Sequence, residues 1–231
     1  DAGEGGDAGR CDRAPADFVS PNDGTVGVDN AMQQVVGTID GLLGVGQTYA
    51  GQLAARIAAG DLLLGIELRG TDPVGAALVV LAPSDPIALG ADGRLAPGQR
   101  FEVVERLGDG AGALGEDGRA RVALGDLRRP LDELAPAIEP TDPADLWPAP
   151  FREVELRFDE GVAGLTGGEL GALVTVDEMV GGMSPLTTPG VGHPREVLED
   201  LADLRPSAAD PTVCAAISLG FAFEAVPASF E

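Results

Sequence analysis

The sequence predicts a mainly β protein with some helix: an antiparallel β-sandwich of jelly-roll or lectin-like type, with two N-terminal helices packed on it. Several segments alternate apolar and polar residues, as half-buried strands do. Two segments near the N-terminus instead carry apolar residues at helical spacing. The chain has 231 residues, 44% of them hydrophobic, which is enough to bury a core. We expect residues 1–16 to form a flexible tail and residues 17–231 a single domain, with its helical segment at about 28–59.

The first predicted helix covers residues 28–43, where Val28, Met32, Val35 and Ile39 recur three or four residues apart. The second covers residues 49–59, which include Leu53, Ile57 and several alanines. Gly60 is well placed to end it, because glycine commonly terminates helices.

The predicted strands begin after this helical region. Residues 62–69 alternate in character, residues 75–81 are apolar, and the turn sequence Thr71-Asp72-Pro73 between them favours a hairpin. In residues 151–158 the charged side chains lie on the face opposite Val154, Leu156 and Phe158, as in an antiparallel strand with one wet face. Further strands are predicted at residues 100–107, 119–124, 171–175 and 216–226.

Other segments are predicted to connect or decorate these strands. The proline-rich stretch at residues 125–150 cannot form a central strand, so it is a surface excursion or a domain linker. The glycine-rich sequence from Gly164 to Gly171 is interpreted as a turn. Short helices are predicted at residues 176–180 and 194–204.

Charge excludes some classes of partner. Thirty-eight acidic and fifteen basic residues give a formal net charge of −23. Such a chain would repel nucleic acids and anionic membrane surfaces. It contains no apolar run of the length that crosses a bilayer, so we predict no transmembrane segment.

The two cysteines, Cys11 and Cys214, lie near opposite ends of the chain and have no metal-ligand spacing. They form either a disulfide or two unrelated thiols in a reducing compartment. We favour the disulfide, which predicts an oxidising, extracytoplasmic location. The tail before Asp12 has the composition of a solvated tether or of a frayed terminus.

One acidic turn is a candidate metal site. Oxygen-bearing side chains surround Gly24 and Gly27, and oxygen ligands suit Ca²⁺. The spacing differs from that of an EF-hand loop, so helix capping explains the same residues. A second acidic loop, from Asp200 to Asp210, would approach this turn if the disulfide forms. The candidate calcium ligands are Asp17, Asn22, Asp23, Asp29 and Asn30.

Catalytic patterns are weak. The single histidine, His193, precedes a proline in a glycine-rich loop, and there is no G-x-S-x-G motif. Glu153 and Glu155 share a strand face, as two acids of a glycoside hydrolase would. Exposed strands often show the same alternation, and few aromatic residues are available to stack on sugars.

Four stretches of the sequence are considered together: Gly24 to Asn30, Gly60 to Leu64, Gly167 to Asp177 and Cys214 to Val226. They resemble a group of secreted or lipoprotein-type proteins of myxobacteria. The resemblance implies an exported or cell-envelope protein of uncharacterised function and carries over no catalytic residues. Thr25 and Ala208-Ala209 depart from the aspartate-rich pattern of that group, which weakens the calcium site.

The functional expectation is a secreted or cell-surface binding module without catalytic activity and without a required cofactor, either stabilised by Ca²⁺ at the acidic turn or independent of it. Its partner would be a protein or glycan at the cell surface, or a second copy of itself. One alternative is a subunit of an extracellular filament or coat, in which the apolar strand at residues 216–226 completes a neighbour's sheet. The other is a carbohydrate-active enzyme with two carboxylates.

Overall fold

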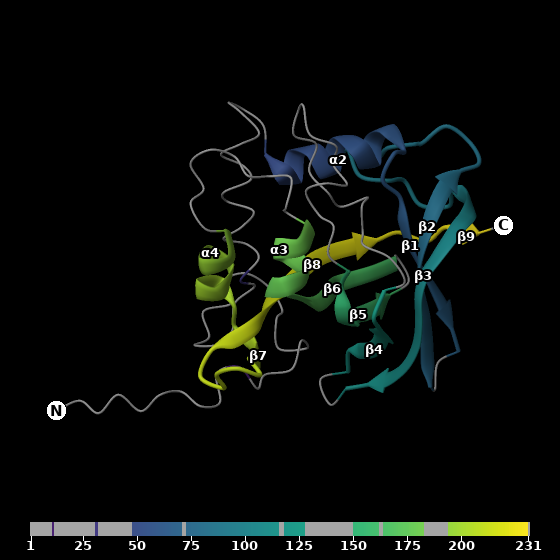
Figure 1. Cartoon of the computed structure of the whole chain (residues 1–231). Coiled ribbons are helices and arrows are strands. Elements are labelled where there is room, and N and C mark those ends of the chain that lie inside the picture. The colour runs from purple at the N-terminus through teal and green to yellow at the C-terminus, as the bar shows by residue number, and fades with distance from the viewer. Residues whose placement is uncertain are drawn as a thin grey trace.

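The fold is mainly β. The computed structural model describes Cys11, Ala31 and residues 48–70, 73–115, 118–127, 150–161, 164–182 and 194–230. Within these residues it contains three short helices and nine strands, drawn in Figure 1. The helices are α2 (Tyr49–Ala59), α3 (Val176–Gly182) and α4 (Pro194–Leu201). The strands are β1 (Leu64–Arg69), β2 (Val74–Pro83), β3 (Arg100–Leu114), β4 (Ala120–Gly125), β5 (Arg152–Gly161), β6 (Gly164–Thr175), β7 (Leu204–Pro206), β8 (Cys214–Ala225) and β9 (Ser229–Phe230).

All nine strands belong to one open sheet with the order β1-β2-β3-β4-β5-β6-β8-β7. Every pairing along this order is antiparallel, and β9 adds a short parallel pairing to β3. The mainly β, antiparallel part of the prediction is therefore confirmed. The predicted sandwich is not shown, because the strands pair continuously from one end of the sheet to the other instead of dividing into two facing sheets.

The long strand β3 turns the sheet between its two halves. Its pairing with β2 shifts register twice, between Leu78 and Val79 and between Val80 and Leu81, which are irregularities typical of β-bulges. In Figure 1, β1 to β3 run across the direction of β5, β6 and β8. At Gly112 the neighbouring strand comes so close that an added Cβ would lie 1.6 Å from the backbone oxygen of Arg121. Only glycine fits at that point.

The sheet is buried on both faces at β2. Ala76 and Leu78 belong to the main core, which continues under β4, β5, β6 and β8. Ala77 and Val79 point to the opposite face and join a second apolar cluster with Leu63, Leu81 and Phe101. Burial on both faces explains the uninterrupted apolar sequence of this strand.

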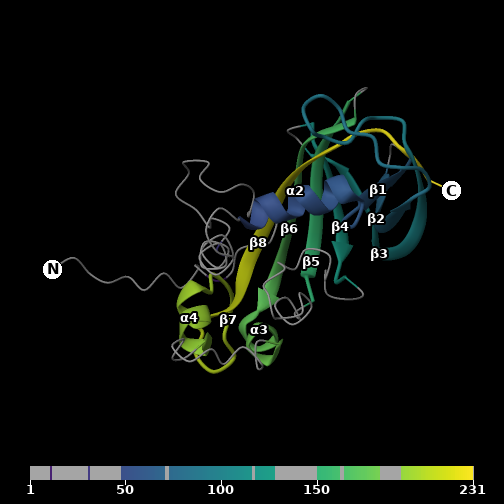
Figure 2. The same ribbon diagram turned by 90° about the horizontal axis from the view of Figure 1, so that it is seen from above.

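Helix α2 forms as the sequence predicts. Thr48 caps its start, with its hydroxyl oxygen accepting a hydrogen bond from Gly51 N (3.1 Å), and Gly60 ends it in the left-handed conformation. Leu53 and Ile57 pack against the main core, and Figure 2 shows the helix lying across the sheet. The predicted helix at residues 28–43 lies outside the described residues apart from Ala31, and the other two helices follow β6, so two N-terminal helices packed on the sheet are not shown.

The glycine-rich sequence from Gly164 to Gly171 is not a turn, as interpreted from the sequence, but most of β6. Gly168 pairs with Phe223 of β8, and the Phe223 ring occupies the space where a Cβ of residue 168 would lie, within 2.4 Å. The aromatic ring thus supplies the apolar cover that the glycine lacks. The predicted strand at residues 100–107 was likewise too short, since β3 continues through alternating glycines to Leu114.

Candidate functional site

The two cysteines form a disulfide that ties the N-terminal part of the chain to the end of the sheet. Cys11 and Cys214 are bonded across a sequence separation of 203 residues. Cys11 also lies along the outer edge of β7, where its carbonyl oxygen accepts a hydrogen bond from Arg205 N (2.6 Å). The predicted disulfide is therefore present. It joins residues 11 and 214, and the backbone of Cys11 covers the outer edge of β7.

A second contact holds the N-terminal part at the same place. Ala31 N donates a hydrogen bond to the Ser218 hydroxyl (3.0 Å), and that hydroxyl donates to the Asp203 carboxylate. Asp203 also accepts a hydrogen bond from Ser218 N (2.8 Å). All three residues are buried, so the polar groups satisfy one another within the core. Cys11 and Ala31 both contact the region of β7 and β8.

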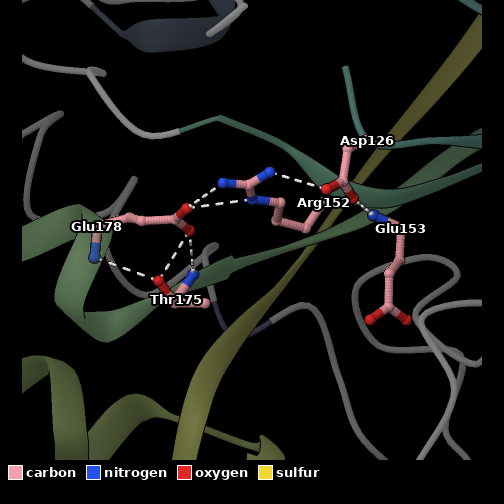
Figure 3. A network of polar contacts seen from close by, with 5 residues as sticks. All are labelled: Asp126, Arg152, Glu153, Thr175 and Glu178. Carbon is pink, nitrogen blue, oxygen red and sulfur yellow. Dashed lines mark hydrogen bonds and ion pairs between the residues drawn. The ribbon is translucent and has the colours of Figure 1, made fainter. Parts of the chain in front are cut away.

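Arg152, at the start of β5, joins three elements in one polar network (Figure 3). Its guanidinium donates two hydrogen bonds to Glu178 of α3 (2.6 and 3.1 Å) and one to Asp126 after β4 (2.8 Å). The other oxygen of Asp126 accepts a hydrogen bond from Glu153 N (3.0 Å). An arginine with carboxylates on two sides is oriented rigidly by its planar, multi-donor group.

Thr175 and Glu178 form the start of α3. Glu178 N donates to the Thr175 hydroxyl oxygen (3.2 Å), and the Glu178 carboxylate accepts from the Thr175 hydroxyl (2.7 Å) and from Thr175 N (3.4 Å). This reciprocal arrangement is a capping box. The sequence from Thr175 to Glu178 carries the Thr-x-x-Glu signature of this motif.

The network also sets the ionisation of its carboxylates. The backbone hydrogen bond from Glu153, helped by Arg152, lowers the pKa of Asp126 below its ordinary value. Burial alone would raise the pKa of Glu178, but hydrogen bonds from Arg152 and Thr175 outweigh it, and the pKa is lowered. The hydrogen bonds to Glu178 and Asp126 raise the pKa of Arg152. Both carboxylates are thus held charged.

Two non-glycine residues at this end of the sheet have left-handed backbones, and their side chains form an ion pair with each other. Glu153 has φ 51° and Arg205 has φ 54°. The Arg205 guanidinium binds the Glu153 carboxylate. Glu153 lies in β5 and Arg205 in β7, and in the sheet order β6 and β8 lie between these two strands. Positive φ is unfavourable for both residue types, and such strain is found preferentially at functional sites. We call the pair Glu153–Arg205 the strained pair.

Glu153 and Glu155, the two acids of the glycoside-hydrolase hypothesis, each bind a different arginine. Glu153 binds Arg205, and its carboxylate points away from the Arg152 guanidinium in Figure 3. Glu155 binds Arg157 (2.9 Å) within the same strand. Each carboxylate therefore has its own arginine partner, and no contact between the two carboxylates pairs them as the two acids of a glycosidase site.

The other predicted site residues are placed only in part. The candidate calcium ligands Asp17, Asn22, Asp23, Asp29 and Asn30 lie outside the described residues, as does His193. In the second acidic loop, Asp203 faces inward to Ser218, and Asp210 accepts hydrogen bonds from Thr212 N (2.9 Å) and its hydroxyl (2.7 Å). These hydrogen bonds lower the pKa of Asp210. Asp203 and Asp210 therefore both have hydrogen-bond partners close by.

The comparisons with known proteins find no match: no family model, no curated protein and no solved structure is similar to this chain. In the part of the chain that the structure describes, no three histidine, cysteine or acidic side chains gather as metal ligands would. None of the described helices is long and apolar enough to span a membrane.

Proposed function

We propose that this protein is an exported binding module without catalytic activity, with a cell-surface protein or glycan as its partner. Its binding face is the end of the sheet formed by the start of β5, the start of α3 and β7. The observation that carries the proposal is the strained pair, two residues with unfavourable backbones whose side chains form an ion pair with each other. The proposal does not use the lectin-like sandwich predicted from the sequence. It requires only a binding surface built from strand ends and loops.

The surroundings of the strained pair support a rigid, preorganised surface. The disulfide lies beside Arg205, whose backbone N–H is bonded to Cys11. The Arg152 network fixes the backbone of Glu153 on the other side. A preorganised surface loses less conformational entropy when it binds a partner. The disulfide and the resemblance to secreted or lipoprotein-type proteins of myxobacteria support export.

The proposal is tested with binding measurements on two double variants. Glu153→Ala with Arg205→Ala removes the strained pair, and Arg94→Ala with Glu224→Ala removes an exposed ion pair elsewhere on the molecule. Immobilised glycans and cell-envelope proteins serve as ligands. We expect the first variant to lose binding at least about tenfold, since a binding face tolerates loss of its central charges poorly. We expect the second to bind as the wild type does.

Equal binding by both variants would show that the strained pair is not part of a binding face. Free thiols at Cys11 and Cys214 in protein isolated from its native source would remove the argument for export. Calcium stabilisation remains a separate proposal: a thermal shift lost in EDTA and restored by Ca²⁺ supports it, and an unchanged melting temperature at millimolar Ca²⁺ contradicts it.

A filament built by strand pairing needs a different strand from the apolar one at residues 216–226. Strand β8, at residues 214–225, pairs along its length with β6 and also with β7. It is therefore used inside this chain's own sheet. An alternative based on strand pairing has to use an outer edge of the sheet.

A further inference from the structure

The strand at the other end of the sheet, β1, has a free outer edge among the described residues. It pairs with β2 alone, in a register without shifts. Leu63 O accepts a hydrogen bond from Leu81 N (2.9 Å). Because the bonding direction alternates in an antiparallel ladder, Gly65, Glu67 and Arg69 direct their backbone groups to β2. Leu64, Ile66 and Leu68 then direct their N–H and C=O groups away from the sheet.

The side chains of β1 suit a second strand of the same kind. Leu64, Ile66 and Leu68 are half-buried and pack against the main core from the edge. A second strand paired beside Leu68 would cover the part of its side chain that is still in contact with water, which is favourable for apolar surface.

The opposite face of β1 carries a neutral group of four charges. Glu67 binds Arg106 of β3 (2.5 Å), and Arg69 binds Asp109 of β3. Arg69 also lies 3.9 Å from Glu67, and Arg106 lies 3.7 Å from Asp109. Two acids and two arginines sum to zero. The edge is therefore locally neutral although the whole chain has a formal charge of −23, and the remaining repulsion between two chains is screened at physiological ionic strength.

We propose that the outer edge of β1 binds β1 of a second copy of this chain, antiparallel and across a twofold axis. A twofold centred on Leu68 places Glu67 of each copy opposite Arg69 of the other. Opposite charges in directly facing positions stabilise a strand pair. A twofold centred on Glu67 would set two glutamates against each other, and one centred on Ile66 would set Glu67 against Gly65. Charge complementarity thus selects the register at Leu68.

This proposal goes beyond the proposed function, because it concerns the opposite end of the sheet and a different partner. The binding face at the strained pair stays accessible in such a dimer. Either proposal can fail without the other.

Sedimentation of the full chain over a range of concentrations tests it, with two variants of one residue. Leu68→Ala shortens the side chain, whereas Leu68→Pro also removes the outward N–H and leaves the hydrogen bonds to β2 intact. We expect the wild type and Leu68→Ala to dimerise and Leu68→Pro to associate at least about tenfold more weakly than Leu68→Ala. A wild type that stays monomeric throughout, or equal association of the two variants, overturns the proposal.

Oxidative cross-linking tests the register. Both native cysteines are already in the disulfide, so Leu68→Cys introduces one free thiol. Directly paired residues lie about 5.5 Å apart at Cα, within disulfide range. We expect Leu68→Cys to form a covalent dimer and Ile66→Cys to remain uncross-linked. The reverse result, or no cross-link at either position, contradicts the register that the charges select.

Discussion

The two outer edges of the sheet, β7 and β1, are finished in different ways. Strand β7 has three residues, ends in Pro206, is bent by the left-handed Arg205, and gives an outward N–H to Cys11. Short length, proline and covering backbone are devices that prevent unwanted strand pairing. Strand β1 has six residues and none of these protections among the described residues. The β7 edge is thus protected against strand pairing, whereas the β1 edge is open to it.

Removing the disulfide should have the largest effect on this contrast. The double variant Cys11→Ser with Cys214→Ser loses a cross-link over 203 residues, which the chain-entropy model values at about 5 kcal/mol as an upper figure. We expect a lower free energy of unfolding in urea and faster hydrogen exchange at the Arg205 amide, with exchange in the β1–β2 ladder less affected. Slow, unchanged exchange at Arg205 would show that β7 is guarded without the disulfide.

The next effect concerns the strand that turns the sheet between the two edges. Gly112→Ala places a Cβ against the backbone oxygen of Arg121, which cannot move without breaking the pairing of β3 and β4. We expect a loss of about 3 kcal/mol in the free energy of unfolding. Gly181→Ala is the matched control, because nothing lies within 4 Å of its Cβ position. Equal stability of the two variants would show that the close approach is not present in solution.

A smaller effect tests the bend that guards β7. Arg205→Gly removes the cost of a left-handed backbone and loses only an exposed ion pair, so we expect unfolding free energy equal to or up to about 1 kcal/mol above the wild type. Arg205→Val keeps that cost and adds a β-branched side chain, so we expect a loss of about 1–2 kcal/mol. A more stable valine variant would mean that Arg205 is not left-handed.

The smallest effect is the response to acid. Asp126 and Glu178 have pKa values below their ordinary ones, so the stability they contribute is fully present above the ordinary pKa of about 4 and is lost as the pH falls through the folded values. We expect Glu178→Gln to lose less stability than the wild type when thermal unfolding is compared between pH 6 and pH 3. Parallel losses would show that Glu178 is not held charged.

The sequence could predict those features of the fold that depend on residues close together in the chain. Helix α2, its end at Gly60, and the buried face of Val154, Leu156 and Phe158 follow from spacing alone, and the structure confirms them. The start of β6 does not, because Gly168 is a strand residue only by virtue of Phe223, which lies 55 residues later in the sequence and directly opposite in the sheet.

In the candidate site, too, the features that depend on a simple residue pattern were predictable and those that depend on distant strands were not. The disulfide was predicted because two cysteines leave one possible pair, and the capping box of Thr175 and Glu178 was readable from its spacing. The strained pair was not readable, since a left-handed backbone at Glu153 or Arg205 has no signature in residue type. It arises where β5 and β7, far apart in the chain, come within reach at one end of the sheet.

The disulfide has a consequence for the way the protein responds to proteolysis. Most of the chain, including its loops, lies between Cys11 and Cys214. A protease that cuts one of those loops therefore leaves both fragments covalently joined, and the cut ends stay close enough for the sheet to hold them. Such a cleaved molecule would migrate as a single species in electrophoresis until a reductant breaks the disulfide. A single cleavage therefore does not by itself separate the two parts of the sheet.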